Sequence, residues 1–306
     1  MVTVLDTDRN PPHGGAAVPA RPTTYPPPEP TPSGSDDPPM STEDRTDVEV
    51  ARRAWRRAPL AAIAWLAPDG APDAASVLPL TGSGRPVLAL PYAQIDLARA
   101  LATSTEVVLA VVSPSQAGPG PSAPAALLVT VRGRAEVTAD PTGERFQDTG
   151  LIEVELAKYP TSRRRLDSLL LRREHWWFLP RLLVCIDGLH RPRTVPPGDG
   201  LLVTGGRALQ VDPCHIEDRE PLRIRATGPG ADRRPAAVIE YGGDLPELER
   251  PWERRWHGTL EADRFETDRV TGEGPSDRPL GLRQRLRAEK QLERACKAGL
   301  REAGHA

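Results

Sequence analysis

The sequence has few cysteines and no long hydrophobic run. Only Cys185, Cys214 and Cys296 occur in 306 residues, and they lie far apart. An odd number of widely spaced cysteines provides neither a disulfide framework nor a metal-ligand spacing, and a reducing cytoplasm is the compartment we expect. No apolar run approaches the roughly 20 residues that span a bilayer. The N-terminus also lacks the basic segment and apolar core of a secretory signal.

An excess of basic charge is absent as well, since the formal net charge is −2. Nucleic-acid-binding proteins usually carry a clear positive excess. The partners that we expect are therefore a small-molecule substrate, with no nucleic acid and no membrane. Abundant proline, alanine, arginine and glycine are typical of a GC-rich bacterial genome.

Several catalytic motifs are missing. No G-x-G-x-x-G follows a predicted strand, and there is neither a G-x-S-x-G elbow nor an H-E-x-x-H helix. None of the six histidines has a partner four residues away, so we predict no metal site. Cys214 and His215 are adjacent, and neighbours on a strand point to opposite faces, which argues against a thiol–imidazole pair.

Residues 1–40 contain 11 of the 35 prolines. Such a segment buries too little apolar surface to offset its ordering entropy, and we predict a disordered tail with polyproline character. A ligand for a proline-binding module is the alternative. The rest divides into a barrel domain (41–195), a second β-rich half (196–279) and a basic amphipathic C-terminal helix (280–306).

The first domain is predicted to consist of short strands with few helices. Helices are predicted from Ser41 or Thr42 to Pro59, and over Gln94–Ala102 and Glu144–Lys158. Strands are predicted over Leu60–Leu66, Ala74–Leu80, Val87–Tyr92, Glu106–Val112, Ala125–Thr138 and Leu182–Ile186. Too few helices separate the strands for a parallel sheet, so this order favours a mainly antiparallel barrel.

The stretch Leu169–Asp187 (LLLRREHWWFLPRLLVCID) combines aromatic and basic side chains before a predicted buried strand. Trp176 and Trp177 are adjacent in it. A planar, anionic small molecule would need such a set, although a strand entering a core has the same composition. The basic residues that frame the tryptophans are Arg172, Arg173, His175 and Arg181.

These segments together resemble the pyridoxamine 5'-phosphate oxidase-like family, the FMN-binding split barrels. The resemblance rests on LAAIAWLAPDGAPDAASVLPL, PVLALPYAQIDLARALATSTEVVLAVV, LLVTVRGRAEVTAD, EVELAKYPTSRRRLDS and HWWFLPRLLVCID, which follow the family's order over about residues 43–195. It implies a six-stranded barrel, usually dimeric, with a flavin or a haem between the subunits. The chain is more distantly similar to the haem-handling branch.

The resemblance also implies roles for individual residues. The stretch that corresponds to the family's phosphate-binding helix starts at Tyr92 and has no Lys or Arg before Arg99. Arg85, Arg99 and the N–H groups that open the Gln94 helix are the substitutes, and Tyr92 is also predicted to bind the cofactor. Trp177 would border the cofactor ring. His175 and Arg181 would face the anionic substrate or cofactor.

The second half contains strand candidates at Leu201–Val203, Ala208–Val211, Leu222–Ala226, Ala236–Tyr241 and Gly258–Phe265. Arg85–Tyr92 is echoed by Arg234–Tyr241, and Arg132–Glu136 by His257–Glu261. We therefore interpret this half as a possible degenerate, shortened barrel. It would pair with the first as a pseudo-dimer within one chain, and a homodimer is the alternative. If their segment is helical, Trp252 and Trp256 share one face, and packing in a core explains them more simply than stacking on a ligand.

The last segment, Leu280–Ala303, predicts a helix with an interrupted apolar stripe and a basic majority. It could dock on the barrel, on a partner helix or on an anionic surface, or simply be solvated.

Three functions are compatible with these features. The first is a flavin-dependent redox protein that uses FMN, because in such enzymes the cofactor supplies the chemistry and the protein supplies orientation and electrostatics. The second is haem binding or breakdown, with His175 or His190 as the iron ligand. The third is a non-catalytic module that has lost its cofactor. If the chain is an enzyme, we expect an oxidoreductase.

Overall fold

Two antiparallel sheets make up most of the computed structural model, which describes residues 42–113, 126–206, 208–219, 222–226, 233–243, 251–262, 264–275 and 281–305. These residues belong to one compact unit, Met40–Ala306. The predicted proline-rich tail lies outside the described residues. The fold is therefore mainly β, as the sequence predicts.

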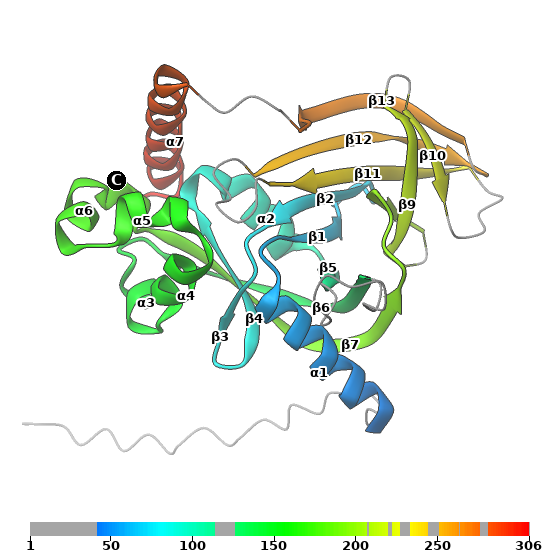
Figure 1. Cartoon of the computed structure of the whole chain (residues 1–306), viewed down its shortest axis with the longest axis horizontal. Coiled ribbons are helices and arrows are strands. Elements are labelled where there is room, and N and C mark those ends of the chain that lie inside the picture. The colour runs from blue at the N-terminus through cyan, green and yellow to red at the C-terminus, as the bar shows by residue number, and fades with distance from the viewer. Residues whose placement is uncertain are drawn as a thin grey trace, which may run out of the picture. The chain divides into compact units, whose positions relative to one another are not determined.

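The first sheet has seven strands in the order β2-β1-β5-β6-β7-β4-β3 (Figure 1). The strands are β1 (Ala61–Leu66), β2 (Pro72–Val77), β3 (Leu80–Gly82), β4 (Arg85–Pro91), β5 (Val107–Ser113), β6 (Leu127–Asp140) and β7 (Arg181–Val195). This sheet is the split barrel expected for the first domain.

Strand β1 is buried on both faces, and its sequence shows why. Ile63 and Trp65 belong to the barrel core, which also includes Leu109 of β5 and Val184 of β7. The alternate residues Ala62 and Ala64 pack instead with the second sheet. Successive side chains on a strand point to opposite faces, so bulky residues fill the barrel and small residues allow close approach of the other sheet.

Helix α1 (Thr42–Arg57) supplies the barrel core with its apolar face. Val48, Ala51 and Trp55 join the core cluster, and Trp55 Nε1 donates a hydrogen bond of 2.6 Å to the carbonyl oxygen of Leu80. The spacing of three and four residues on α1 predicts this face.

The other helices gather at one side of the sheet (Figure 1). They are α2 (Ile95–Thr103), which follows the 3-10 turn η1 (Tyr92–Gln94), α3 (Glu144–Asp148), α4 (Leu151–Lys158), α5 (Pro160–Leu166), α6 (Leu169–Glu174), the 3-10 turn η2 (Trp176–Phe178) and α7 (Leu282–Glu302). The predicted helix Glu144–Lys158 is wrong as a single helix. Gly150 has φ +72°, which ends α3 and restarts the chain as α4.

The second sheet has six strands in the order β10-β9-β8-β11-β12-β13. They are β8 (Gly200–Thr204), β9 (Gln210–Arg219), β10 (Leu222–Ala226), β11 (Arg234–Gly242), β12 (Trp252–Glu261) and β13 (Arg264–Glu273). Its edge strands β10 and β13 contact each other, so the sheet curls around a small core that includes Trp256, Leu260 and Val238. A barrel-like second half, as predicted, is what this curl produces.

One prediction for this half is wrong in detail. The predicted strand Gly258–Phe265 is two strands, because the chain turns at Ala262 with φ +54°. Trp252 and Trp256, whose shared face was argued for the case of a helix, lie on β12. Four residues span about one turn of a helix and two full periods of a strand, so both conformations place the two rings on one face.

One predicted strand of the first domain is also divided. Ala74–Leu80 forms β2 and then β3, which pairs with β4 and not with β1. The echoed segments differ in their pairing as well. β11 and β12 pair directly, whereas β4 and β6 both pair with β7, which lies between them. Descent of the two halves from one repeat remains a prediction.

Candidate functional site

A cleft of about 850 Å³ lies between the first sheet, the helices and the second sheet. Residues of β2, β4, α2, α4, α5, β12 and α7 line it. Its apolar walls include Trp65, Leu90, Phe178, Trp252 and Leu292. The volume is within the range of about 300–1,000 Å³ that small-molecule and cofactor sites occupy.

One wall of the cleft holds a buried ion pair. Arg181 at the start of β7 is 0% exposed, and its Nη2 lies 3.5 Å from Oε1 of Glu155 on α4. The same carboxylate oxygen accepts a hydrogen bond of 2.6 Å from the Ser162 hydroxyl. The rings of Phe146 and Phe178 lie 4.5 and 4.2 Å from the guanidinium carbon. Burial lowers the pKa of Arg181, while the charge of Glu155 opposes this change.

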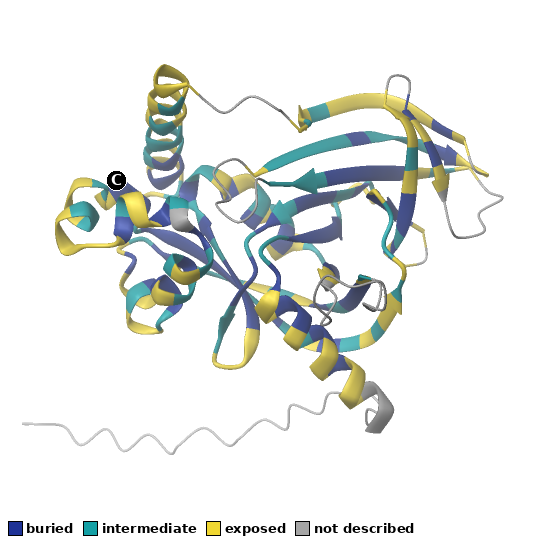
Figure 2. Cartoon of the chain, viewed as in Figure 1, coloured by how far each residue is buried: buried dark blue, intermediate teal, exposed yellow. Residues whose placement is uncertain are grey.

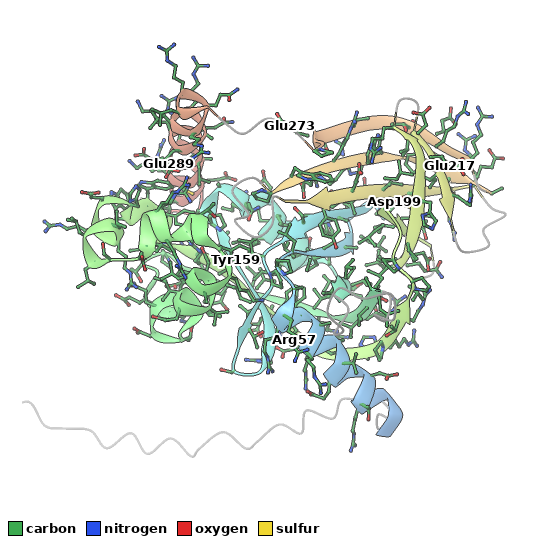
Figure 3. The ribbon with its side chains drawn as sticks, in the orientation of Figure 1. Arg57, Tyr159, Asp199, Glu217, Glu273 and Glu289 are labelled. Carbon is green, nitrogen blue, oxygen red and sulfur yellow. The ribbon has the colours of Figure 1, made fainter. Side chains whose placement is uncertain are left out.

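A second ion pair ties the helices together at the cleft. Arg165 of α5 donates two hydrogen bonds to the carboxylate of Glu289 on α7, the first of them 2.6 Å long (Figure 3 labels Glu289). The guanidinium of Arg165 also lies 4.8 Å from the ring centre of Phe178. The bidentate geometry fixes α7 against the helical side of the barrel.

The opposite end of the cleft is polar and is built by both sheets. On β12, Glu253, Arg255 and His257 alternate along the strand and share one face. Ser76 of β2 donates its N–H and its hydroxyl to Glu253 Oε2, at 2.7 and 2.8 Å. Nε2 of His257 lies 2.9 Å from Oδ1 of Asp73, and Nη1 of Arg255 lies 3.4 Å from the same oxygen.

Asp73 is held as a carboxylate by this network. Burial alone would raise its pKa, but the hydrogen bond with His257 and the positive charge of Arg255 outweigh it and lower the pKa below its usual value. Arg255 and Asp73 both line the cleft. The second half therefore contributes charged groups to a site whose apolar walls come mainly from the first half.

The structure separates the predicted site residues. Of the six, Arg181 lies in the cleft wall, and the other five are absent from its described lining. Trp177 is buried among the helices, with its ring centre 6.0 Å from that of His175. Nδ1 of His175 lies 3.0 Å from the carbonyl oxygen of Leu171. The adjacent Trp176 is 53% exposed, so the two tryptophans do not form one platform.

The predicted phosphate-end residues lie in three other environments. Arg85 binds Asp187 at 2.8 and 2.9 Å near the end of the β3–β4 hairpin. Arg99 pairs with Glu302 of α7. Tyr92 is buried under α7, and its hydroxyl has no hydrogen-bond partner among the described residues. They do not form a common phosphate site.

Sequence reasoning missed Asp73, Glu253, Arg255 and His257. Glu253, Arg255 and His257 are spaced by two residues, but Arg254 between the first two is also charged, so the segment shows no clear alternation. The partners on β2 and β12 are 177 to 184 residues apart, and no local pattern links them.

The described lining of the cleft can be compared with what a haem and a flavin each require. Protein ligands of haem iron are His, Cys, Met or Tyr side chains, and the described residues lining the cleft include none of these types. His190, the other predicted iron ligand, lies beside Gly188 and Glu106. A flavin needs flat apolar walls and cationic groups for its phosphate. The cleft has aromatic and aliphatic walls and includes Arg164 and Arg285. Its lining also contains the acidic residues Asp73, Asp96, Glu155, Glu253 and Glu289.

Comparison with known proteins gives distant structural similarities. No protein-family model matches the chain, and no curated protein matches its sequence. Solved structures that are similar include a haem-binding protein from Mycobacterium smegmatis, with 16% identity, a TM-score of 0.34, and 82% of this chain and 98% of that chain covered. HutZ, a haem storage protein from Vibrio cholerae, has 11% identity, a TM-score of 0.31, and 47% and 93% covered.

A pyridoxamine 5'-phosphate oxidase-related, FMN-binding protein from Nostoc punctiforme is also similar. It has 10% identity, a TM-score of 0.31, and 62% of this chain and 98% of that chain covered. Such low scores do not define what this chain binds, so its function has to be argued from its own cleft.

Proposed function

We propose that this chain is a small-molecule-binding redox protein of the split-barrel class that holds a flavin such as FMN in the cleft. The observation that carries the proposal is the cleft itself, with its apolar walls, its cationic groups and its volume of about 850 Å³. A bound flavin would supply the redox chemistry, and the chain would orient it and exclude water from it.

The residues of the cleft suggest how each part of the ligand would be held. Trp65 and Leu90 of the barrel and Trp252 of the second sheet provide surfaces for a flat ring system. Arg164 and Arg285, each of which also has a partner within the chain, line the cleft and would supply positive charge near a phosphate group. The polar end around Asp73 and Arg255 would face the polar edge of the ring or a second small molecule.

A non-catalytic module remains the second candidate, because of the ion pairs of Arg85 and Arg99. Each arginine is matched with a carboxylate. In a site that still binds a cofactor phosphate, Arg85 and Arg99 would point at the phosphate and not at carboxylates of the chain. Haem binding is less well supported, because the described residues that line the cleft include no side chain that ligates haem iron.

The test is a matched pair of substitutions on α7. Ala288 lines the cleft, and Ala298 is exposed on the same helix outside it. We expect the purified chain to quench the fluorescence of added FMN, and Ala288→Trp to weaken that binding by about tenfold or more because its indole occupies the cleft. Ala298→Trp should bind FMN as the wild type does.

Absorption spectra distinguish the candidates. A flavin doublet in the purified or reconstituted protein supports the proposal. A Soret band supports haem binding instead. A colourless protein that neither FMN nor haem restores supports the non-catalytic module, and equal FMN binding by the two Trp variants would move the ligand out of the cleft.

A further inference from the structure

Helix α7 carries a regular stripe of cationic side chains that the cleft does not use. Basic residues recur at alternating spacings of four and three residues over 18 positions, or about 27 Å of helix. These spacings keep them on one side of the helix. We call these residues the basic stripe: Arg283, Arg287, Lys290, Arg294, Lys297 and Arg301.

The basic stripe faces solvent. All its members except Lys297 are exposed, and among the described residues those five form no ion pair. Lys297 is paired with Glu293 at 2.6 Å and lies 5.5 Å from the ring centre of the exposed Trp176. The three acidic residues of α7, Glu289, Glu293 and Glu302, lie outside the stripe and are paired with basic residues. The stripe is thus a surface of one sign of charge.

Four apolar residues lie one residue before members of the basic stripe, at 282, 286, 296 and 300, and Glu289 and Glu293 occupy the two positions between them. Cys296 and Leu300, near the end of α7, are 0% and 2% exposed against the helical layer and the barrel. Leu282 and Leu286, in its first turns, are 73% and 55% exposed. Figure 2 shows these first turns mostly in the colour of exposed residues. The first turns of α7 therefore expose two leucines beside the basic stripe, and the paired residues Glu289 and Glu293 separate them from the packed end of the helix.

We propose that this face of α7 binds the surface of an anionic lipid membrane. The basic stripe matches acidic headgroups, and exposed Leu282 and Leu286, with Trp176 beside Lys297, are side chains that enter the headgroup boundary. A polyanion such as nucleic acid would use the cations but would gain nothing from the leucines. No helix among the described residues is long and apolar enough to cross a membrane. The expectation of no membrane partner rests on the lack of a spanning segment, and an anionic surface is already one of the docking partners considered for this helix.

The test is sedimentation of the full chain with vesicles of phosphatidylcholine and phosphatidylserine, and with vesicles of phosphatidylcholine alone. We expect binding to the acidic vesicles only, weakened by added salt. Each basic side chain near an anionic surface contributes about a fivefold change in partitioning. Neutralising Arg287, Lys290 and Arg294 together (R287Q, K290Q, R294Q) is expected to lower binding on the order of 100-fold.

The matched control removes the same charge from another helix. Arg53, Arg56 and Arg57 are exposed on α1, so R53Q, R56Q and R57Q together change the net charge equally and should leave most of the binding intact. Replacing Leu282 and Leu286 by Gln should cost about tenfold without changing charge. Circular dichroism of each variant checks that α7 is still folded.

Three results would overturn the proposal. The first is no sedimentation with acidic vesicles, which would leave the basic stripe as a solvated face. The second is equal loss in the two triple variants, which would mean that net charge alone acts. The third is retention of duplex DNA or RNA without vesicle binding, which would assign the stripe to nucleic acid.

Discussion

Nε2 of His257 on β12 lies 2.9 Å from Oδ1 of Asp73 on β2, so one hydrogen bond joins two strands that belong to different sheets. Both side chains are mostly buried, at 16% and 26% exposure. β2 is an edge strand of the first sheet, and its backbone also bonds to the second half: Ser76 N–H donates to Glu253, and the Ala74 carbonyl oxygen accepts from Arg255. Asp73 itself lines the cleft.

Replacing Asp73 should make the free energy of unfolding less sensitive to a fall in pH. The pKa of Asp73 is lowered in the folded protein, so its stabilising contribution is present above about pH 4, the unfolded value, and is lost as pH falls through the folded value. We expect Asp73→Asn to lower the free energy of unfolding by about 1–2 kcal/mol at neutral pH and by much less near pH 3. Urea denaturation at the two pH values measures this.

Asp69→Asn is the matched control for that experiment. Asp69 lies in the neighbouring turn, where its carboxylate accepts a hydrogen bond of 3.0 Å from the N–H of Ala71. An amide oxygen can accept the same bond, so a small effect is expected. If Asp73→Asn is no more destabilising than Asp69→Asn, the link between the sheets is energetically unimportant.

The sequence predicts the barrel well because its signals are local. Alternation on β1, the apolar face of α1 and the proline that ends it each depend on residues within one element. The same is true of the basic C-terminal helix. The curl of the second sheet also follows from short strands joined by turns, although the turn at Ala262 was not recognised, since it contains no glycine or proline.

The cleft could not be predicted, because it depends on which distant segments meet. Arg181 and Trp177 follow one another closely in an aromatic and basic stretch that suits a ligand or a core equally well. The chain places both in the core, Arg181 at 0% and Trp177 at 3% exposure. Burial of the Arg181 guanidinium depends on Glu155, 26 residues earlier in the chain, because this carboxylate provides the countercharge.

Replacing Arg181 should therefore affect folding more than ligand affinity, the reverse of what an anion-binding arginine would do. Arg181→Met leaves Glu155 buried without its countercharge, and we expect a loss of about 3–5 kcal/mol in the free energy of unfolding. Adding Glu155→Leu should recover much of this loss, because an apolar pair needs no countercharge. Chemical denaturation of the two variants, with exposed Arg173→Met as control, measures both effects.

An alternative result would restore the predicted binding role of Arg181. Its Nε has no hydrogen-bond partner among the described residues, so a ligand acceptor could still reach it. If Arg181→Met keeps its stability but loses FMN binding, the guanidinium contacts the ligand.

Lys158 should make the stability of the protein rise with pH above neutrality. Its Nζ donates to the carbonyl oxygens of Pro79, Ala58 and Trp55 at 2.6, 3.3 and 3.4 Å, and burial lowers its pKa to about 8. The unfolded chain keeps this proton up to about pH 10.4, so it binds more protons than the folded state between the two values. Stability contributed by Lys158 therefore increases with pH across that window.

The measurement compares the wild type with Lys158→Met from about pH 7 to about pH 9.5. The wild type should gain stability relative to the variant over this range. Exposed Lys290→Met, the control, should follow the wild type. Parallel curves for all three proteins would mean that the three carbonyl groups hold the ammonium ion well enough to cancel the effect of burial.

Gly299 should be the residue of α7 that tolerates least change, although it lies within the helix. Replacing a helical glycine by alanine normally stabilises by about 1 kcal/mol. Here a Cβ at position 299 would collide with the backbone carbonyl of Tyr92. Either this carbonyl group or helix α7 would have to move. We expect Gly299→Ala to destabilise the protein by about 1–3 kcal/mol, and to expose α7 to trypsin, since docking of the helix fails before the barrel unfolds.

Ala298→Gly, one residue earlier on the exposed side, should cost about 1 kcal/mol through helix propensity alone and leave α7 protected. A thermal melt and a proteolysis time course separate the two effects, and a more stable Gly299→Ala would show that α7 does not pack on η1.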